Sequence, residues 1–194
     1  MKSIGIYGGS FNPPHLGHLI VVDSVCEQLG LDKVIFIPAS TPPHKLGVAL
    51  APSLDRYEMT ALAIRHNSLF EVSDLEIHRE GYSYTIDTIL QLEVLYPKAK
   101  FSLLIGADNF VDIESWKSLE EIIAKVDLVV MNRPEYSIAR HSGKYARMAR
   151  FVTVPAIGIS STDIRRRVKQ GRSIRYLVPK EVEQYIYIKG LYRE

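Results

Sequence analysis

The sequence has little cysteine, little tryptophan, no excess of one charge and no long apolar run. It contains one cysteine and one tryptophan in 194 residues, and 24 basic side chains are balanced by 22 acidic ones. A single thiol cannot form an internal disulfide, and a near-neutral chain has no general attraction to nucleic acid. No segment approaches the roughly 18 apolar residues of a membrane helix, and nothing resembles a signal peptide. We therefore expect a cytoplasmic protein that binds neither nucleic acid nor membranes.

Three common catalytic motifs are also missing. The chain has neither the G-x-G-x-x-G loop of dinucleotide oxidoreductases nor the G-x-x-x-x-G-K-[ST] loop of P-loop NTPases. It lacks the G-x-S-x-G turn that carries the nucleophile of many serine hydrolases. Hydride transfer, Walker-type hydrolysis and acyl transfer by a serine triad are therefore disfavoured.

Apolar runs and helical patterns alternate along almost the whole chain. This alternation predicts an α/β fold, a doubly wound parallel sheet with helices on both faces, and the length suits a single domain over residues 1–194. Cys26 lies on the apolar face of the first helix, which favours a packing role. We expect strands at Ser3–Gly8, Lys33–Pro38, Phe70–Ser73, Lys100–Gly106, Leu128–Asn132 and Phe151–Val154, and helices at Leu16–Leu29, Ser53–His66, Tyr84–Tyr96, Leu119–Lys125, Thr162–Gln170 and Lys180–Ile188.

The segment after the first expected strand, residues 8–18, reads GGSFNPPHLGH. Glycines let an anion approach the backbone, and the N-terminus of the next helix offers unpaired N–H groups with partial positive charge. His15 and His18 lie three residues apart and can point at one ligand, with Gly17 between them leaving the backbone open. The segment predicts a phosphate site. A turn with two surface histidines is the plainer alternative, and a zinc pair has weak support because no third ligand lies at a suitable spacing.

A second candidate phosphate site opens the helix near residue 162. Ser160, Ser161 and Thr162 place hydroxyls at a helix N-terminus, and Arg165 follows on the same side. The alternative is an ordinary N-cap followed by surface arginines. We favour that alternative for Arg166 and Arg167, because neighbouring residues do not share a helix face.

Each candidate motif follows an expected strand. In a doubly wound sheet, ligands bind beyond the carboxyl ends of the strands, where the strand order reverses. The motifs should therefore converge on one crevice. Two loops, residues 39–52 and 133–150, are long enough to be lids or binding loops. The motifs are residues 8–18, 42–45 (Pro-Pro-His-Lys), 106–109 (Gly-Ala-Asp-Asn), 132–134 (Asn-Arg-Pro) and 159–165.

The motifs at 15–18 and 160–165 resemble those of the nucleotidyltransferase superfamily, H-x-G-H and S-[ST]-T-x-I-R. Within it, the ordered set of motifs is similar to the bacterial nicotinate-nucleotide adenylyltransferase family. The resemblance covers essentially the whole chain and implies a Rossmann-like fold. Asn12 stands where many relatives have Asp, which we expect to alter turn hydrogen bonds more than chemistry. The further segments that carry the resemblance are 8–15, 42–45, 83–88, 106–109, 176–179 and 185–186.

The resemblance implies transfer of AMP from ATP to nicotinate mononucleotide, with release of pyrophosphate, in NAD biosynthesis. A phosphate monoester is mostly dianionic at neutral pH and can attack the α-phosphorus without a general base. The resemblance assigns donation to the α-phosphate to His18, phosphate binding to His15, and neutralisation of the β- and γ-phosphates to Lys45 and Arg165. Mg²⁺ would arrive bound to ATP, without a metal site of the protein. The residues implied to bind ATP are Gly8, Gly9, Ser10, Phe11, His15, His18, Lys45, Gly106, Asp108, Ser160, Ser161, Thr162 and Arg165.

The acceptor side depends more on the resemblance. Trp116 would stack on the pyridine ring, the N–H groups of Tyr84 and Thr85 would bind the nicotinate carboxylate, and Arg133 would reach a phosphate. Read without the resemblance, these residues fit a core anchor, a helix cap and a loop. Adenylyl transfer to phosphopantetheine and a non-catalytic nucleotide-binding domain are the alternative functions. The choice between acid and amide acceptors, and assembly as a homo-oligomer, stay open.

Overall fold

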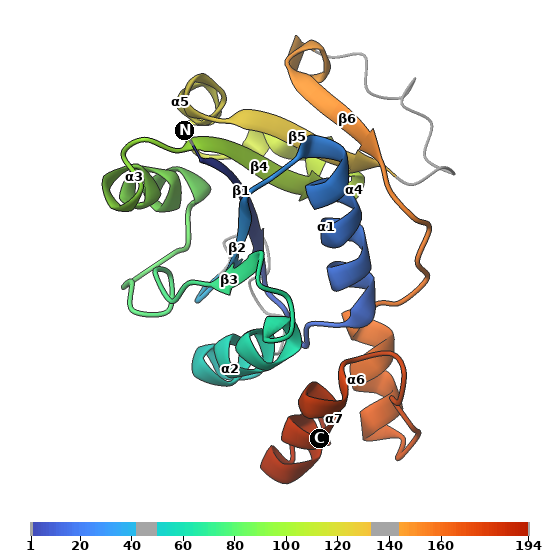
Figure 1. The fold of residues 1–194 in the computed structure, drawn as a ribbon. Coiled ribbons are helices and arrows are strands. Elements are labelled where there is room, and N and C mark those ends of the chain that lie inside the picture. The colour runs from blue at the N-terminus through green and yellow to red at the C-terminus, as the bar shows by residue number, and fades with distance from the viewer. Residues whose placement is uncertain (1, 42–49, 133–143, 194) are drawn as a thin grey trace.

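The fold is a six-stranded parallel sheet covered by helices on both faces (Figure 1). A computed structural model of the chain describes residues 2–41, 50–132 and 144–193. The strands are β1 (Ser3–Gly9), β2 (Lys33–Pro38), β3 (Phe70–Val72), β4 (Lys100–Gly106), β5 (Asp127–Asn132) and β6 (Ala149–Thr153). The helices are α1 (Leu16–Leu29), α2 (Ser53–Ile64), α3 (Thr85–Leu95), α4 (Ala107–Val111), α5 (Leu119–Lys125), α6 (Ser161–Lys169) and α7 (Lys180–Lys189), with 3-10 turns at η2 (Ile113–Ser115) and η4 (Lys144–Arg147).

The strand order β3-β2-β1-β4-β5-β6 confirms the predicted doubly wound sheet. All five pairings between neighbouring strands are parallel. The chain winds outward from β1 to β3, returns to the centre and winds outward again from β4 to β6. The order therefore reverses between β1 and β4, the place where this type of sheet leaves a crevice for ligands.

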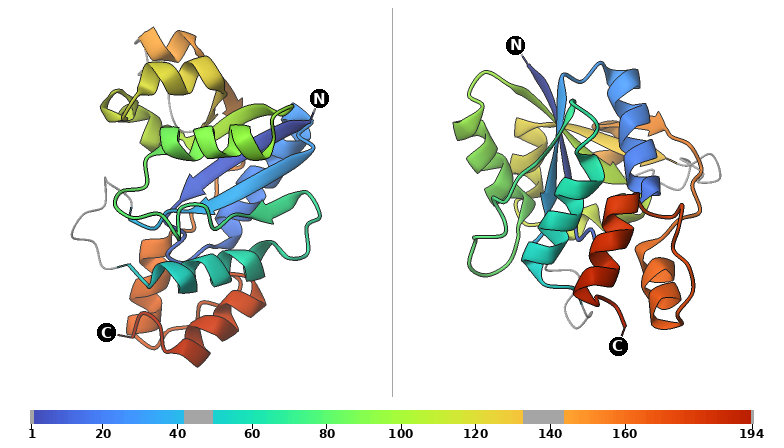
Figure 2. Two further views of the ribbon diagram at one scale, coloured as in Figure 1. Left: turned by 90° about the vertical axis from the view of Figure 1, so that its left-hand side faces the viewer. Right: turned by 60° about the horizontal axis from the view of Figure 1, so that its bottom comes forward.

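Two separate apolar cores lie on the two faces of the sheet. One contains buried residues of α1, α2, α6 and α7, and the other contains residues of α3, α4 and α5. Figure 2 (left) shows α3 on the near face and α1 on the far face. Cys26 is 4% exposed in the first core, as predicted, and burial raises the pKa of its thiol to about 11. It therefore stays an unreactive thiol at neutral pH.

Among the described residues, three short elements were not predicted from the sequence: α4, η2 and η4. None spans two turns of an α-helix, so none shows an apolar period that a sequence pattern could reveal. The other differences lie at element ends. β6 begins at Ala149 and ends at Thr153, and α2 ends at Ile64. Within the described ranges, we find no helix with the length and apolar character needed to span a membrane.

Candidate functional site

A pocket of about 840 Å³ opens beyond the carboxyl ends of β1 and β4, where the strand order reverses. Every predicted site residue in the described part of the chain lines it, so the three motifs that the structure describes, at 8–18, 106–109 and 159–165, converge as expected. Lys45 and Arg133 lie outside the described residues. The predicted residues in the pocket wall are Gly8, Gly9, Ser10, Phe11, His15, His18, Tyr84, Thr85, Gly106, Asp108, Trp116, Ser160, Ser161, Thr162 and Arg165.

The two histidines form a reciprocal cap at the start of α1. The backbone N–H of His18 donates to Nδ1 of His15 at 3.3 Å, and that of His15 donates to Nδ1 of His18 at 3.1 Å. Their rings are stacked, with centroids 3.6 Å apart. Because each Nδ1 accepts a hydrogen bond, each neutral ring carries its proton on Nε2. This tautomer can donate to a phosphate oxygen.

The N-terminus of α1 offers fewer unpaired backbone N–H groups than the sequence suggested. The N–H of Leu16 donates to the carbonyl of Leu177 at 3.0 Å, and the N–H of His18 is used in the cap. Gly17 also serves packing, because a Cβ there would lie 3.0 Å from His15 Nδ1 and 3.2 Å from Ile157 Cγ2. The expectation that these backbone groups receive a phosphate directly is therefore wrong for Leu16 and His18, and the two imidazoles are the better candidates.

The two glycines after β1 have different roles: Gly9 packs against a buried side chain, and Gly8 leaves the backbone accessible. A Cβ on Gly9 would lie 3.1 Å from the ring of Phe11, which is only 2% exposed and packs edge-on against His18. The Phe11 ring thus packs against the turn at Gly9. The backbone of Phe11 itself is in the left-handed region, at φ 42°. At Gly8, by contrast, no described atom lies within 4 Å of a Cβ position. Gly8 is the position where a ligand can approach the backbone.

The start of α6 is connected to the segment before α1. Ser161 Oγ donates to the carbonyl of Pro13 at 2.8 Å, and Arg165 Nη1 donates to the carbonyl of Asn12 at 2.9 Å. Ser160 is an ordinary N-cap, with its hydroxyl accepting from the N–H of Asp163. These bonds hold the guanidinium of Arg165 at the pocket wall. Of the three neighbouring arginines, only Arg165 lines the pocket, as predicted.

Gly106 and Asp108 form the wall at the end of β4. Gly106 is the N-cap of α4, and a Cβ on it would overlap the carboxylate of Asp108. The glycine therefore lets this carboxylate fold back over the end of the strand. Asp108 faces the pocket as an acceptor, in a position suited to hydroxyl groups of a ligand.

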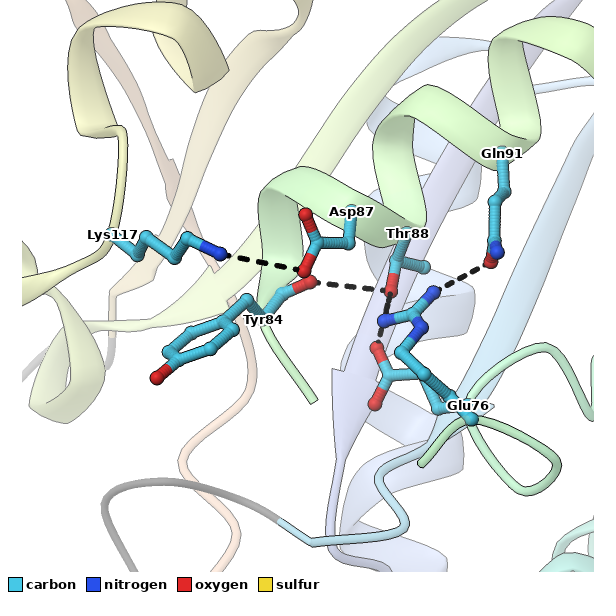
Figure 3. A network of polar contacts seen from close by, with 7 residues as sticks. Glu76, Tyr84, Asp87, Thr88, Gln91 and Lys117 are labelled. Carbon is cyan, nitrogen blue, oxygen red and sulfur yellow. Dashed lines mark hydrogen bonds and ion pairs between the residues drawn. The ribbon is translucent and has the colours of Figure 1, made fainter. Parts of the chain in front are cut away.

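The end of the pocket on the α3 side of the sheet is formed by the start of α3 and the segment around Trp116. Tyr84 is the N-cap of α3, and its side chain makes no capping hydrogen bond. Lys117, which the sequence analysis missed, places Nζ 4.2 Å from the centre of the Tyr84 ring and 3.7 Å from Asp87 Oδ2 (Figure 3). An aromatic face, a cation and a helix N-terminus thus meet at this end.

Glu76 is a buried carboxylate in the same wall that the sequence did not reveal. It is 7% exposed, and it accepts a 2.6 Å hydrogen bond from the hydroxyl of Thr88 (Figure 3). Thr88 in turn accepts from Arg79 Nη1 at 3.0 Å. Burial raises the pKa of Glu76, although hydrogen bonds from Thr88 and Ser83 oppose the shift.

Arg56 is the third residue of the site region, after Lys117 and Glu76, that the sequence analysis missed. It is 1% exposed, and its guanidinium donates at 2.5 to 3.0 Å to four backbone carbonyls. These carbonyls belong to the segments that leave β1 and β2 and enter α2, so Arg56 joins the loops around the pocket. Its only sequence signal is its place in the apolar stripe of α2, with Met59, Thr60 and Ala63. The four carbonyls are those of Ser10, Ala39, Ser40 and Ala51.

The chain is similar over almost its whole length to proteins named as nicotinate-nucleotide adenylyltransferases. A family model described as cytidylyltransferase-like matches residues 6–167. A protein of Desulfitobacterium hafniense named probable nicotinate-nucleotide adenylyltransferase is 44% identical, and the match covers 99% of this chain and 96% of that protein. A Thermus thermophilus protein of the same name is 45% identical, with 98% and 99% covered. The solved structure of Plasmodium falciparum nicotinic acid mononucleotide adenylyltransferase complexed with NaAD has the same fold, with a TM-score of 0.80, 22% identity, and 99% and 98% of the two chains covered.

Proposed function

The chain belongs to the cytidylyltransferase-like family, and from this premise we propose that it is a nicotinate-nucleotide adenylyltransferase. It transfers AMP from ATP to nicotinate mononucleotide and forms nicotinate adenine dinucleotide and pyrophosphate, a step of NAD biosynthesis. The observation that carries the proposal is the pocket itself. It has imidazole, hydroxyl and guanidinium donors on the side of α1 and α6, and an aromatic and helix N-terminal surface on the side of α3, across the sheet.

The chemistry needs donors and cations rather than a base. An oxygen of the acceptor's dianionic phosphate attacks the α-phosphorus of ATP, the bond from this phosphorus to the α,β-bridging oxygen breaks, and pyrophosphate leaves with that electron pair. The Nε2–H of His18 donates to an α-phosphate oxygen as charge moves. His15 holds His18 in this orientation through the reciprocal cap and contributes a second donor. The rate enhancement then comes from positioning and charge stabilisation.

The leaving side requires positive charge near the β- and γ-phosphates. Arg165 supplies it from the described wall, and Lys45 is proposed to add to it. Gly8 gives the phosphates access to the backbone, while Asp108 accepts from the nucleotide's hydroxyl groups. The substrate is MgATP, because Mg²⁺ keeps several waters and binds to phosphate oxygens, where it neutralises their charge.

The acceptor occupies the end near α3. Trp116 stacks on the pyridine ring, and the N–H groups of Tyr84 and Thr85 receive the nicotinate carboxylate at the helix N-terminus. Arg133 is proposed to bind the acceptor phosphate. We also propose a cytoplasmic location for the protein and keep a homo-oligomer as a prediction for size measurement in solution.

The test is pyrophosphate release in the presence of ATP and Mg²⁺ with three separate acceptors: nicotinate mononucleotide, nicotinamide mononucleotide and phosphopantetheine. We expect product with nicotinate mononucleotide, identified by mass as the dinucleotide. Product with phosphopantetheine alone would contradict the acceptor assignment. Product with none of the three would favour a non-catalytic nucleotide-binding domain.

A further inference from the structure

The C-terminal segment of the chain returns to the loop that precedes α1. Helix α7 ends at Lys189 and is capped by Gly190, whose φ of 65° is left-handed, and Tyr192 is also left-handed at φ 63°. For a residue with a side chain this conformation is unfavourable, so other contacts must hold it. The contact is specific: the hydroxyl of Tyr192 donates to Oδ1 of Asn12 at 2.8 Å, across 180 positions of sequence.

Asn12 connects three parts of the molecule at this point. It is 2% exposed, and its Oδ1 also accepts from the N–H of Ala51 at 3.0 Å. Its backbone carbonyl accepts from Arg165 Nη1 at 2.9 Å. One residue therefore joins the C-terminal segment, the entry to α2 and the arginine at the triphosphate end of the pocket.

We propose that Tyr192 is a positioning residue for ATP: by holding Asn12, its hydroxyl fixes the carbonyl that orients Arg165. The proposal rests on the proposed function, since it takes Arg165 as a triphosphate ligand. Tyr192 is not in the wall of the pocket, so it acts through Asn12 and not by contact with ATP. Burial raises the pKa of the Tyr192 hydroxyl, although Arg165 and Arg56 oppose the shift, and the group remains a donor at physiological pH.

Tyr185 offers a matched control from the same end of the chain. Its hydroxyl donates to Oδ1 of Asp55 at 2.7 Å, so it also makes one long-range hydrogen bond, across 130 positions. Neither Tyr185 nor Asp55 lines the pocket. Replacing either tyrosine by phenylalanine removes one hydroxyl and one such bond, but only Tyr192 is connected to Arg165.

The experiment measures the Kd of MgATP, and the kcat and both KM values, for Tyr192→Phe, Tyr185→Phe and the unmodified protein. For Tyr192→Phe we expect the Kd of ATP to rise about fivefold to tenfold, the effect of one hydrogen bond. The KM for nicotinate mononucleotide should stay within about twofold, as should all constants of Tyr185→Phe. An unchanged Kd for ATP in Tyr192→Phe would overturn the proposal, as would equal losses for both substrates or for both tyrosine variants.

A double-mutant cycle with Asn12→Ala gives a second measurement. If Tyr192 acts through Asn12, adding Tyr192→Phe to Asn12→Ala should weaken ATP binding no further. Additive losses would overturn this route. ATP binding is measured without an acceptor, so a protein that binds ATP but does not use nicotinate mononucleotide would refute the proposed acceptor and still test the role of Tyr192.

Discussion

At the scale of single residues, the pocket is organised by hydrogen bonds inside the protein. The two histidines cap one helix and fix each other's tautomer, and Arg165 is held by a carbonyl. These bonds set the direction of each donor before a nucleotide arrives, which lowers the cost of ordering them on binding. The sequence predicted which side chains gather here. It did not predict the contacts of Asn12 and Arg56, because most of their partners lie far away in the chain or are backbone carbonyls, which carry no residue signature. The contact of Glu76 with Thr88 spans only 12 positions, but no periodic pattern of the sequence marks it.

The role of His18 gives the first prediction. If its Nε2–H stabilises charge on the α-phosphate, His18→Ala should lower kcat by about 100- to 1000-fold, as for the loss of one transition-state donor. The KM values should change far less, because the interaction strengthens in the transition state. Steady-state pyrophosphate release measures both. His66→Ala is the control, since the side chain of His66 is 74% exposed and pairs with Glu181 on the surface. Near-normal turnover of His18→Ala would refute the role.

The buried carboxylate of Glu76 gives a prediction about pH. Its pKa is raised from 4.5 in the folded protein, mainly by burial, so its charged form opposes folding. The stability it contributes is complete below the unfolded pKa and is lost as pH rises through the folded pKa. Relative to Glu76→Gln, the unmodified protein should therefore be more stable at low pH than at high pH. Thermal unfolding of both proteins from pH 4 to about 8 measures this difference.

Glu71 is the control of opposite sign. Burial raises the pKa of Glu71, but hydrogen bonds from Lys33 and Tyr96 outweigh this effect and lower it overall. Its contribution to stability is present above the unfolded pKa and is lost as pH falls through the folded pKa. Relative to Glu71→Gln, the unmodified protein should therefore be more stable at high pH than at low pH. If the stability difference from the unmodified protein changed with pH in the same way for Glu76→Gln and Glu71→Gln, the opposite pKa shifts of the two carboxyl groups would be contradicted.

At the scale of elements, the long periodic segments were predictable and the short ones were not. The strand β1 and the helix α1 lie within one residue of their expected bounds. The five-residue α4 depends on tertiary contacts of Ala107 and Phe110 with one core. The cap of α1 was also hidden, because histidine is not a usual N-cap residue and the bond to its partner is visible only in the fold.

The four hydrogen bonds from Arg56 to backbone carbonyls, here called the Arg56 clamp, predict that a conservative substitution at this position lowers the free energy of unfolding. Arg56→Lys keeps the charge, but a single ammonium group cannot reach all four carbonyls. Because each buried carbonyl left without a donor costs about 1–3 kcal/mol, the free energy of unfolding should fall by at least about 2 kcal/mol. Urea denaturation measures it. At the C-cap of the same helix, Arg65→Lys should cost less than about 1 kcal/mol, because the Arg65 side chain is 47% exposed in an ion pair with Glu181. Similar losses at both positions would contradict the clamp.

At the scale of the whole molecule, the sheet order explains why distant motifs form one site. The segments after β1 and β4 diverge where the order reverses, and the pocket opens between them. The sequence was sufficient for this inference, because each motif follows a strand and parallel strands end at one edge. It was insufficient for the return of the C-terminal segment to Asn12, since no local pattern encodes a contact across 180 positions.

This two-ended arrangement predicts how the chain's only tryptophan will respond to each substrate. Trp116 lies at the acceptor end and packs against the core on the α3 side of the sheet, whereas the histidines and Arg165 belong to α1 and α6, which cover the other side. Nicotinate mononucleotide should therefore quench the fluorescence of Trp116, and MgATP alone should change it little. Fluorescence titration of the protein with each substrate measures this. Trp116→Phe should abolish the tryptophan emission and raise the KM for nicotinate mononucleotide more than the KM for ATP. Since stacking on the pyridine ring must alter the surroundings of the indole, unchanged emission at saturating nicotinate mononucleotide would exclude it.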